Sequence, residues 1–266
     1  MRHQNRRIAT ALVGTASILL TSEMGLFRTS PSQSWNVGFT TVARADTSAN
    51  STFQYVPPQR GTPKSTQGTG SRGCTQSTPV TLGLLVPNDH NGQTISDRPT
   101  FFLYVSDKTS VPVEFALVEP GVAKPLYVQK MQVEKGGIIQ VTLPSELPAL
   151  ESGKKYRWSA SLICDANRPS NNVFVQSWIQ RVPVSNDLTA KLAAVTTNRE
   201  SSPQTLQQQA RIFGEKGLWY DALAAISKAS AANPNDPSIK ADFLSLLTQG
   251  GLSNVVAQQQ QALAKQ

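Results

Sequence analysis

Hydrophobic and polar residues alternate along the chain from residue 80 to about residue 183. Such alternation is typical of strands that bury one face, because successive side chains on a strand point to opposite sides. Clusters of Asn, Asp, Gly and Pro separate the alternating stretches and read as turns. The pattern predicts seven strands, at residues 80–86, 100–105, 113–118, 126–133, 138–143, 156–164 and 173–182.

These strands occupy roughly 105 residues with no helical stretch among them. That organisation predicts a β-sandwich over residues 80–184. The alternation places Val113, Phe115 and Leu117 on one face of their strand. It likewise places Trp158 and Cys164 on one face, so we expect Trp158 in the core and Cys164 in or beside it.

Residues 150–158 read Leu-Glu-Ser-Gly-Lys-Lys-Tyr-Arg-Trp. This stretch resembles the entry to the penultimate strand of fibronectin type III and related immunoglobulin-like domains, where a Leu, a Gly and a Tyr form a corner. The resemblance implies an immunoglobulin/fibronectin-like sandwich of about seven strands, in which the Tyr156 hydroxyl bonds nearby backbone.

The hydrophobic period changes to that of helices after residue 184, which predicts a small all-α segment over residues 185–252. Ser202 and Pro203 form a good helix start, and Gly250-Gly251 a good end. We expect helices at 188–195, 202–216, 220–232 and 238–249. Residues 253–266 form a Gln-rich tail, which is expected to be frayed from Ala257 to Gln266.

The second and third of these helices resemble one tetratricopeptide repeat. Gln209 departs from the repeat, which has a large aliphatic residue there. The resemblance implies a helical hairpin that docks a protein partner, although a single unit lacks the long groove of a repeat array. Its two apolar faces need a cover, so we also expect the hairpin to pack on the sandwich. The matching residues are Leu206, Ala210, Phe213, Gly217, Trp219, Ala222, Ile226, Ala229 and Pro234.

The N-terminus has the pattern of a secretory signal over residues 1–45. Arg2, Arg6 and Arg7 precede an apolar run of about thirteen residues, and Ala43-Arg44-Ala45 offers a cleavage site. We therefore expect an exported protein, periplasmic or extracellular. Residues 46–79 are rich in Ser, Thr, Gly and Pro and predict a flexible leader. No later apolar run reaches the length of a membrane span.

Cys74 and Cys164 both follow the signal, and an even cysteine count in an oxidising compartment predicts one disulfide between them. The whole chain carries a net charge of +8. Residues 1–45 contain five Arg against one Glu, which leaves 20 basic and 16 acidic residues, scattered along the rest. This charge gives no reason to expect nucleic-acid binding.

The chain offers little catalytic chemistry. After the signal it contains one histidine, His90, which excludes a metal site built from several His within one chain. His90 with Asp89 and Asp97 reads as a solvated turn rather than as metal ligands. We expect no catalytic, cofactor or metal site. The remaining route to an enzyme is a pair of facing carboxylates, as in a hydrolase, from Glu114, Glu119, Glu134, Glu146, Glu151 and Asp165.

Trp178 is the one candidate for a ligand-facing aromatic. It alternates with Gln176 and Gln180, so its face of the strand combines an aromatic ring with amides. Such a face suits a sugar, which stacks on the ring and bonds the amides through its hydroxyls. The plainer interpretation is that Trp178 covers the edge of the sandwich or packs on the helices.

Several segments resemble the family called domain of unknown function 928, exported proteins known chiefly from cyanobacteria. They include residues 72–74, 98–102, 153–158, 163–165 and 217–223. The resemblance implies export and this architecture, and it brings no activity. We expect a non-catalytic protein-binding or structural module of the periplasm or envelope, with another envelope protein as partner. The alternatives are a carbohydrate-binding module for envelope polysaccharide and an envelope hydrolase.

Overall fold

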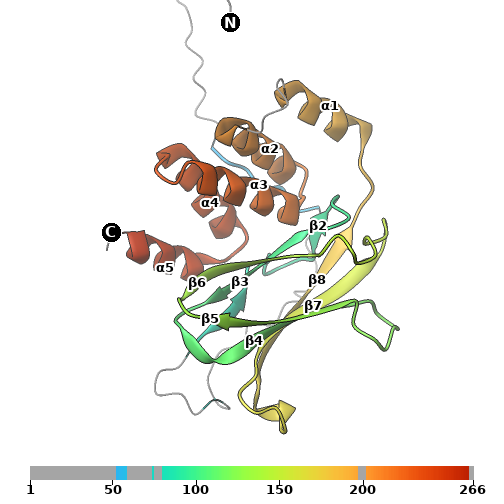
Figure 1. Ribbon diagram of the computed structural model, residues 1–266. Helices are drawn as coiled ribbons and strands as arrows, with labels where there is room; N and C mark the ends of the chain where they lie inside the picture. Colours follow the sequence, from blue (N-terminus) through green and yellow to red (C-terminus); the bar gives the residue numbers. More distant parts are fainter. Residues whose placement is uncertain (1–51, 59–73, 75–79, 197–201, 264–266) are drawn as a thin grey trace, which may run out of the picture. The chain divides into compact units, whose positions relative to one another are not determined.

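A computed structural model of the chain describes residues 52–58, 74, 80–196 and 202–263 (Figure 1). Residues Asn50–Gln266 form one compact unit. The signal expected at 1–45 lies outside the described residues, as does most of the leader.

Eight strands form two sheets in the described residues, a sandwich-like, mainly β region. The three-stranded sheet has the order β1-β3-β6, and the five-stranded sheet has the order β2-β8-β7-β4-β5. Pairing is antiparallel except between β2 and β8. The strands are β1 (Leu82–Leu84), β2 (Gly92–Thr94), β3 (Thr100–Val105), β4 (Thr109–Val118), β5 (Tyr127–Val133), β6 (Gly137–Thr142), β7 (Lys155–Leu162) and β8 (Val173–Arg181).

Strand β2 corrects the prediction of about seven strands. The sequence around it reads as a polar turn, yet Gly92–Thr94 pair in parallel with residues 179–181 of β8. Three residues are too few to display an alternating pattern. Their position depends on a contact with a distant helix, since a Cβ atom at Gly92 would lie 2.6 Å from the Tyr220 ring.

The core between the sheets is aromatic. Phe101 lies 5.1 Å from Phe115 and 5.0 Å from Trp158, measured between ring centroids. All three side chains are fully buried, as the alternation predicts for Phe115 and Trp158. At the corner before β7, the Glu151 N–H donates to the Tyr156 hydroxyl at 2.9 Å, which is the expected backbone bond of that tyrosine.

Five helices follow the strands in the described residues. Ser202 Oγ accepts from the Thr205 N–H, and Asp236 caps the fourth helix in the same way. An ion pair of 2.7 Å between Arg211 and the buried Asp242 joins the second helix to the fourth. The helices are α1 (Asn186–Val195), α2 (Pro203–Glu215), α3 (Trp219–Ala232), α4 (Pro237–Gln249) and α5 (Ser253–Leu263).

Helix α5 corrects the expectation of a frayed tail, because it continues to Leu263. Leu252 and Val255 are almost fully buried and anchor its first turn in the core. The glutamines that follow occupy exposed and partly exposed positions, so their polarity does not oppose a helix.

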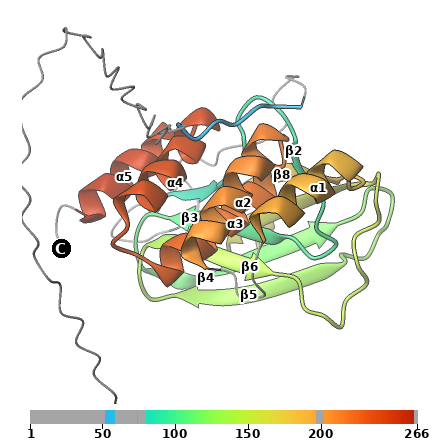
Figure 2. The ribbon, with the colours of Figure 1, turned by 90° about the horizontal axis from the view of Figure 1, so that it is seen from above.

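The expectation of a flexible leader over residues 46–79 is also corrected in part. Residues 52–58, which we call the strap, are extended and alternate between buried and exposed positions (blue in Figures 1 and 2). Phe53 is 3% exposed and Tyr55 is 6% exposed. The composition of the leader, poor in aliphatic residues, hides these two aromatic anchors.

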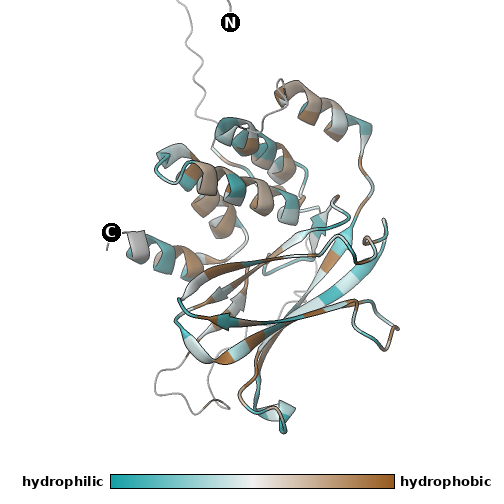
Figure 3. Ribbon diagram, viewed as in Figure 1, coloured by the Kyte–Doolittle hydropathy of each residue, from teal (hydrophilic) through white to brown (hydrophobic). Residues whose placement is uncertain are grey.

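The helices and strands pack as expected, and two buried tryptophan side chains donate hydrogen bonds between them. Trp158 Nε1 donates to the Tyr220 hydroxyl at 2.8 Å, and Trp219 Nε1 donates to the Leu85 carbonyl at 2.8 Å. Apolar positions recur along both strands and helices (Figure 3), and the buried residues form one core. Among the described residues, no helix is long and apolar enough to cross a membrane.

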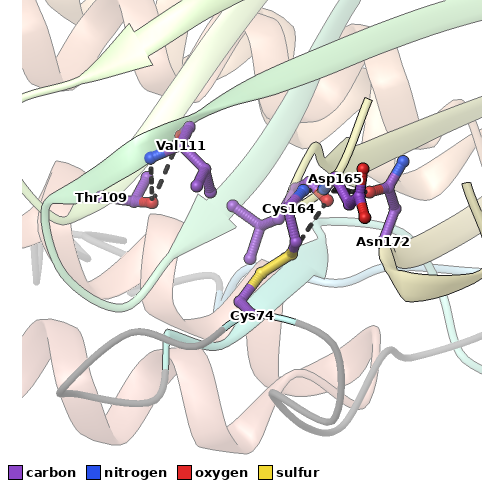
Figure 4. The surroundings of a disulfide bond; sticks show 7 residues. Cys74, Thr109, Val111, Cys164, Asp165 and Asn172 are labelled. Atoms are coloured by element: carbon purple, nitrogen blue, oxygen red, sulfur yellow. Dashed lines mark hydrogen bonds between the residues drawn. A yellow bond between two sulfur atoms is a disulfide. The ribbon is translucent and has the colours of Figure 1, made fainter. Parts of the chain in front are cut away.

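Cys74 and Cys164 form the predicted disulfide, with their Cα atoms 5.0 Å apart (Figure 4). Cys164 follows the end of β7, where its N–H donates to the Asn172 side chain at 2.9 Å. Both cysteines are partly buried and pack against the core, so the bridge attaches the end of the leader to the sandwich.

Candidate functional site

A cavity of about 190 Å³ lies between α2, α3 and the segment that joins β2 to β3. It has an apolar wall from the two helices and a polar rim from the segment. The residues that line it are Thr94, Ser96, Arg98, Pro99, Thr100, Leu206, Gln209, Phe213, Tyr220, Asp221, Ala224, Ala225 and Lys228.

The two helices each present one face to this cavity. On α3 the lining positions are Asp221, Ala224, Ala225 and Lys228, whose spacing places them on one side of a helix. On α2, Leu206 and Phe213 are partly buried and pack against the core. Small alanines of α3 and larger apolar residues of α2 therefore line the same cavity.

Asp221 is the acidic group at this site, and the backbone of the segment after β2 holds it. It lies in the first turn of α3, and its Oδ2 accepts from the Ile95 N–H at 3.0 Å. Burial raises the pKa of Asp221 to about 6, against the effect of hydrogen bonds from Ile95, Thr94 and Ser96, which lower it. The carboxyl thus attaches the hairpin to the strands and remains partly protonated near neutral pH.

Two basic residues complete the rim. Arg98 donates from its guanidinium to the carbonyls of Ser145 and Leu147, both at 2.7 Å, which holds the rim against the loop after β6. Lys228 is exposed at the opposite end of the α3 face. The arrangement suits a ligand with an apolar portion for the helical wall and polar groups for the rim.

The pKa of Asp221 predicts a pH-dependent stability. Folding raises this pKa from 3.8 to about 6. The contribution of the Asp221 carboxyl to stability is therefore fully present below pH 3.8 and is lost as the pH rises through 6. As the pH rises from 3.8 to 6, the free energy of unfolding of the wild type should fall by up to about 3 kcal/mol relative to that of Asp221→Asn, because the asparagine does not ionise. Urea titrations at several pH values measure this difference. Asp97→Asn, at an exposed position nearby, is the control, and parallel curves for wild type and Asp221→Asn would contradict the prediction.

The cavity does not contain the facing carboxylates that a hydrolase needs. Asp221 is the only carboxyl among its described lining residues. Glu119 and Glu151 do lie close together, but Lys154 Nζ bridges them at 2.8 and 2.6 Å. Asp165 accepts from backbone N–H groups of its own turn, as expected of a turn residue.

His90 is a correction to the sequence interpretation, because it is 6% exposed rather than solvated. Its Nδ1 lies 2.6 Å from the Asp89 carboxylate, and its Nε2 lies 2.6 Å from the Tyr55 hydroxyl. Asp97 is exposed and has no part in this cluster. Within the described ranges, no group of three or more His, Cys, Asp or Glu side chains could hold a metal ion.

Trp178 lies on the outer face of the five-stranded sheet, because on β8 it alternates with the buried residues Ser177 and Ile179. It is partly exposed, and Phe174 on the same face is 49% exposed. Across β7 the neighbouring positions are Arg157, opposite Trp178, and Ser161, opposite Phe174. The described structure therefore places Trp178 on the same sheet face as a second aromatic residue, Phe174, and not among the residues that line the cavity.

Sequence reasoning missed the cavity residues Arg98, Asp221 and Lys228. Arg98 and Asp221 occur in the segments that carry the family resemblance, but more than 120 positions separate them. The spacing of Asp221, Ala225 and Lys228 along one predicted helix could have indicated a shared face. By itself, however, such spacing is typical of any helix face and does not indicate a cavity.

The described residues thus form a disulfide-bonded protein in which a sandwich-like β region and a C-terminal helical part share one core. A family model described as Domain of Unknown Function (DUF928) matches residues 67–260, and the chain belongs to this family. No curated protein matches the sequence.

Among solved structures, the native conformation of E. coli alpha-2-macroglobulin is similar over 68% of this chain and 16% of that chain. The identity is 11% and the TM-score is 0.23, so this likeness carries no argument about the present protein.

Proposed function

We propose that the chain is a non-catalytic exported protein that binds a segment of another envelope protein at the α2–α3 cavity. The observation that carries this proposal is the cavity itself, with its apolar helical wall of Leu206 and Phe213 and its charged rim. Tetratricopeptide hairpins commonly bind peptides on their helices, and the resemblance of residues 202–234 to one repeat supports the same use here by analogy.

Export is part of the same proposal. The Arg-rich start, the apolar run and Ala43-Arg44-Ala45 support a secretory signal over residues 1–45. The Cys74–Cys164 disulfide fits an oxidising compartment such as a periplasm. We also assign the strands to the immunoglobulin/fibronectin-like class, and the Glu151–Tyr156 corner supports this assignment.

Filling the cavity should block partner binding. Ala224→Phe adds a ring to the cavity wall, while Ala231→Phe makes the same change at an exposed position of the same helix that does not line the cavity. After photocrosslinking from position 209 in the native envelope, mass spectrometry should recover one partner with wild type and Ala231→Phe. Recovery with Ala224→Phe should fall roughly tenfold, which corresponds to about 1.4 kcal/mol of binding energy. Equal recovery with both variants would remove the cavity as the docking site.

A second candidate function is binding of envelope polysaccharide at the outer face of the five-stranded sheet. Phe174 and Trp178 are four residues apart on β8, roughly 13 Å along the strand, with Gln176 between them. Two rings at this distance suit two different sugars of one chain. Retention on immobilised polysaccharide tests this candidate, with Phe174→Ser compared against Val128→Ser, an exposed aliphatic position on β5.

A further inference from the structure

The strap is held in the manner of a bound peptide. Its residues alternate, with Phe53 and Tyr55 buried and Gln54 and Val56 exposed. It belongs to neither sheet in the described residues. It runs instead against α2 and α4, where the Val56 N–H donates to the Gly214 carbonyl at 3.0 Å.

Gln249 of α4 clamps the strap backbone from the other side. Its Oε1 accepts from the Tyr55 N–H at 2.8 Å, and its Nε2 donates to the Phe53 carbonyl at 2.9 Å. These bonds and the bond to Gly214 use main-chain groups of the strap. Main-chain pairing combined with pockets for alternate side chains is how extended peptides are recognised.

Two glycines let the strap approach α2 closely. A Cβ atom at Gly214 would lie 2.7 Å from the Gln54 carbonyl oxygen and 2.9 Å from the Phe53 ring. A Cβ atom at Gly217 would lie 2.7 Å from the Val56 carbonyl oxygen. The end of α2 therefore leaves room for the strap backbone only because glycine occupies these two positions, and any larger residue at either position would obstruct the strap.

The two buried aromatics supply the specificity. The Tyr55 ring contacts Trp219 edge-on, with 5.1 Å between centroids. The Tyr55 hydroxyl lies 2.6 Å from His90 Nε2, and His90 Nδ1 lies 2.6 Å from the Asp89 carboxylate, so the three side chains form one hydrogen-bonded chain. The surface that holds the strap, which we call the groove, is formed by Gly214, Gly217, Gln249, Trp219 and His90. It suits an uncharged segment with aromatic residues at alternate positions.

The family model covers the residues that form the groove but not the strap that occupies it. The matched residues, 67–260, include Gly214, Gly217 and Gln249, whereas the strap at 52–58 lies outside them. Fifteen residues, 59–73, separate the strap from Cys74, the point where the disulfide attaches the chain to the sandwich. That length of chain can reach up to about 50 Å, far enough for a neighbouring molecule.

We propose that the groove between α2 and α4 is a polypeptide-binding site and that two copies of this chain pair by exchanging their straps. Each copy carries both the groove and the segment that fits it, so the exchange repeats in the partner every contact made within one chain. Such reciprocal exchange closes as a symmetric dimer. The site is separate from the α2–α3 cavity, so this proposal does not depend on the proposed function.

Two full-length variants test the exchange. Gly214→Ala obstructs the groove but favours the helix, so it leaves the strap free. Phe53→Ser with Tyr55→Ser removes the anchors of the strap and leaves the groove empty. Light scattering should show each variant alone as a monomer and the mixture as a 1:1 heterodimer with twice the mass. Gly83→Ala is the matched control, because a Cβ atom there meets nothing within 4 Å. Like the wild type, it should form a symmetric dimer by itself, because its strap and its groove are both intact, and a monomeric wild type would overturn the proposal.

A second measurement covers the case in which the strap variant does not fold. A protease site inserted between residues 59 and 73 is cut after the wild-type protein has folded, and a labelled peptide of residues 50–58 is added. The labelled peptide should replace the bound strap, and a scrambled peptide should not. Absence of both peptide exchange and heterodimer would overturn the proposal. Peptide exchange without a heterodimer from folded variants would also overturn it, because the groove would then not join two copies.

Discussion

Replacing Trp219 by alanine is expected to lower the free energy of unfolding by about 3–5 kcal/mol, the largest single-residue effect we predict. The side chain is fully buried where α3 meets the strands and the strap. Its removal leaves a cavity and also leaves the Leu85 carbonyl without its 2.8 Å hydrogen bond, and the loss for this buried acceptor accounts for about 1–3 kcal/mol of the total. Urea unfolding followed by circular dichroism measures the change.

Trp219→Phe separates the two contributions. It keeps most of the buried ring volume and loses the N–H donor, so its cost should be well below that of Trp219→Ala. Trp178→Ala, at a partly exposed position on the outer sheet face, serves as a control for loss of a tryptophan. Because strands and helices share one core, strand and helix signals should be lost in a single transition. A cost under about 1 kcal/mol for Trp219→Ala would contradict the structural role given to this residue.

Removing the disulfide is expected to have the next largest effect. Changing Cys74 and Cys164 together to serine should lower the free energy of unfolding by about 2–4 kcal/mol. The two cysteines are 90 positions apart, so the bridge restricts a long loop in the unfolded chain. Both are partly buried, and serine in their place brings little strain to the surrounding core.

Wild-type protein treated with reductant should show the same loss, while reductant should not affect the double serine variant. Thiol labelling of the unreduced, denatured wild type checks the bond directly. Two reactive thiols per chain would show that the cysteines are not bonded, and equal stability of variant and wild type would show that the bond contributes nothing.

The elements with a regular hydrophobic period could be predicted from the sequence. Alternation around Phe115 and Trp158 places both rings in the core, and the helix-start signal at Ser202 agrees with the observed cap. The pairing of the cysteines follows from their number and expected compartment. These features depend on neighbouring residues, whose pattern is visible along the chain.

The remaining features were decided by contacts between distant residues. Gly92 pairs as a strand because Tyr220 packs over it, and the strap is ordered because Phe53 and Tyr55 reach pockets made by residues far along the chain. The cavity exists because the Arg98 segment crosses the α3 face that carries Asp221. By itself the sequence determined the periodic elements and the bridge, through local geometry and cysteine chemistry. Only the tertiary structure decided the strap, β2 and the site, because burial of a residue depends on partners that no local pattern specifies.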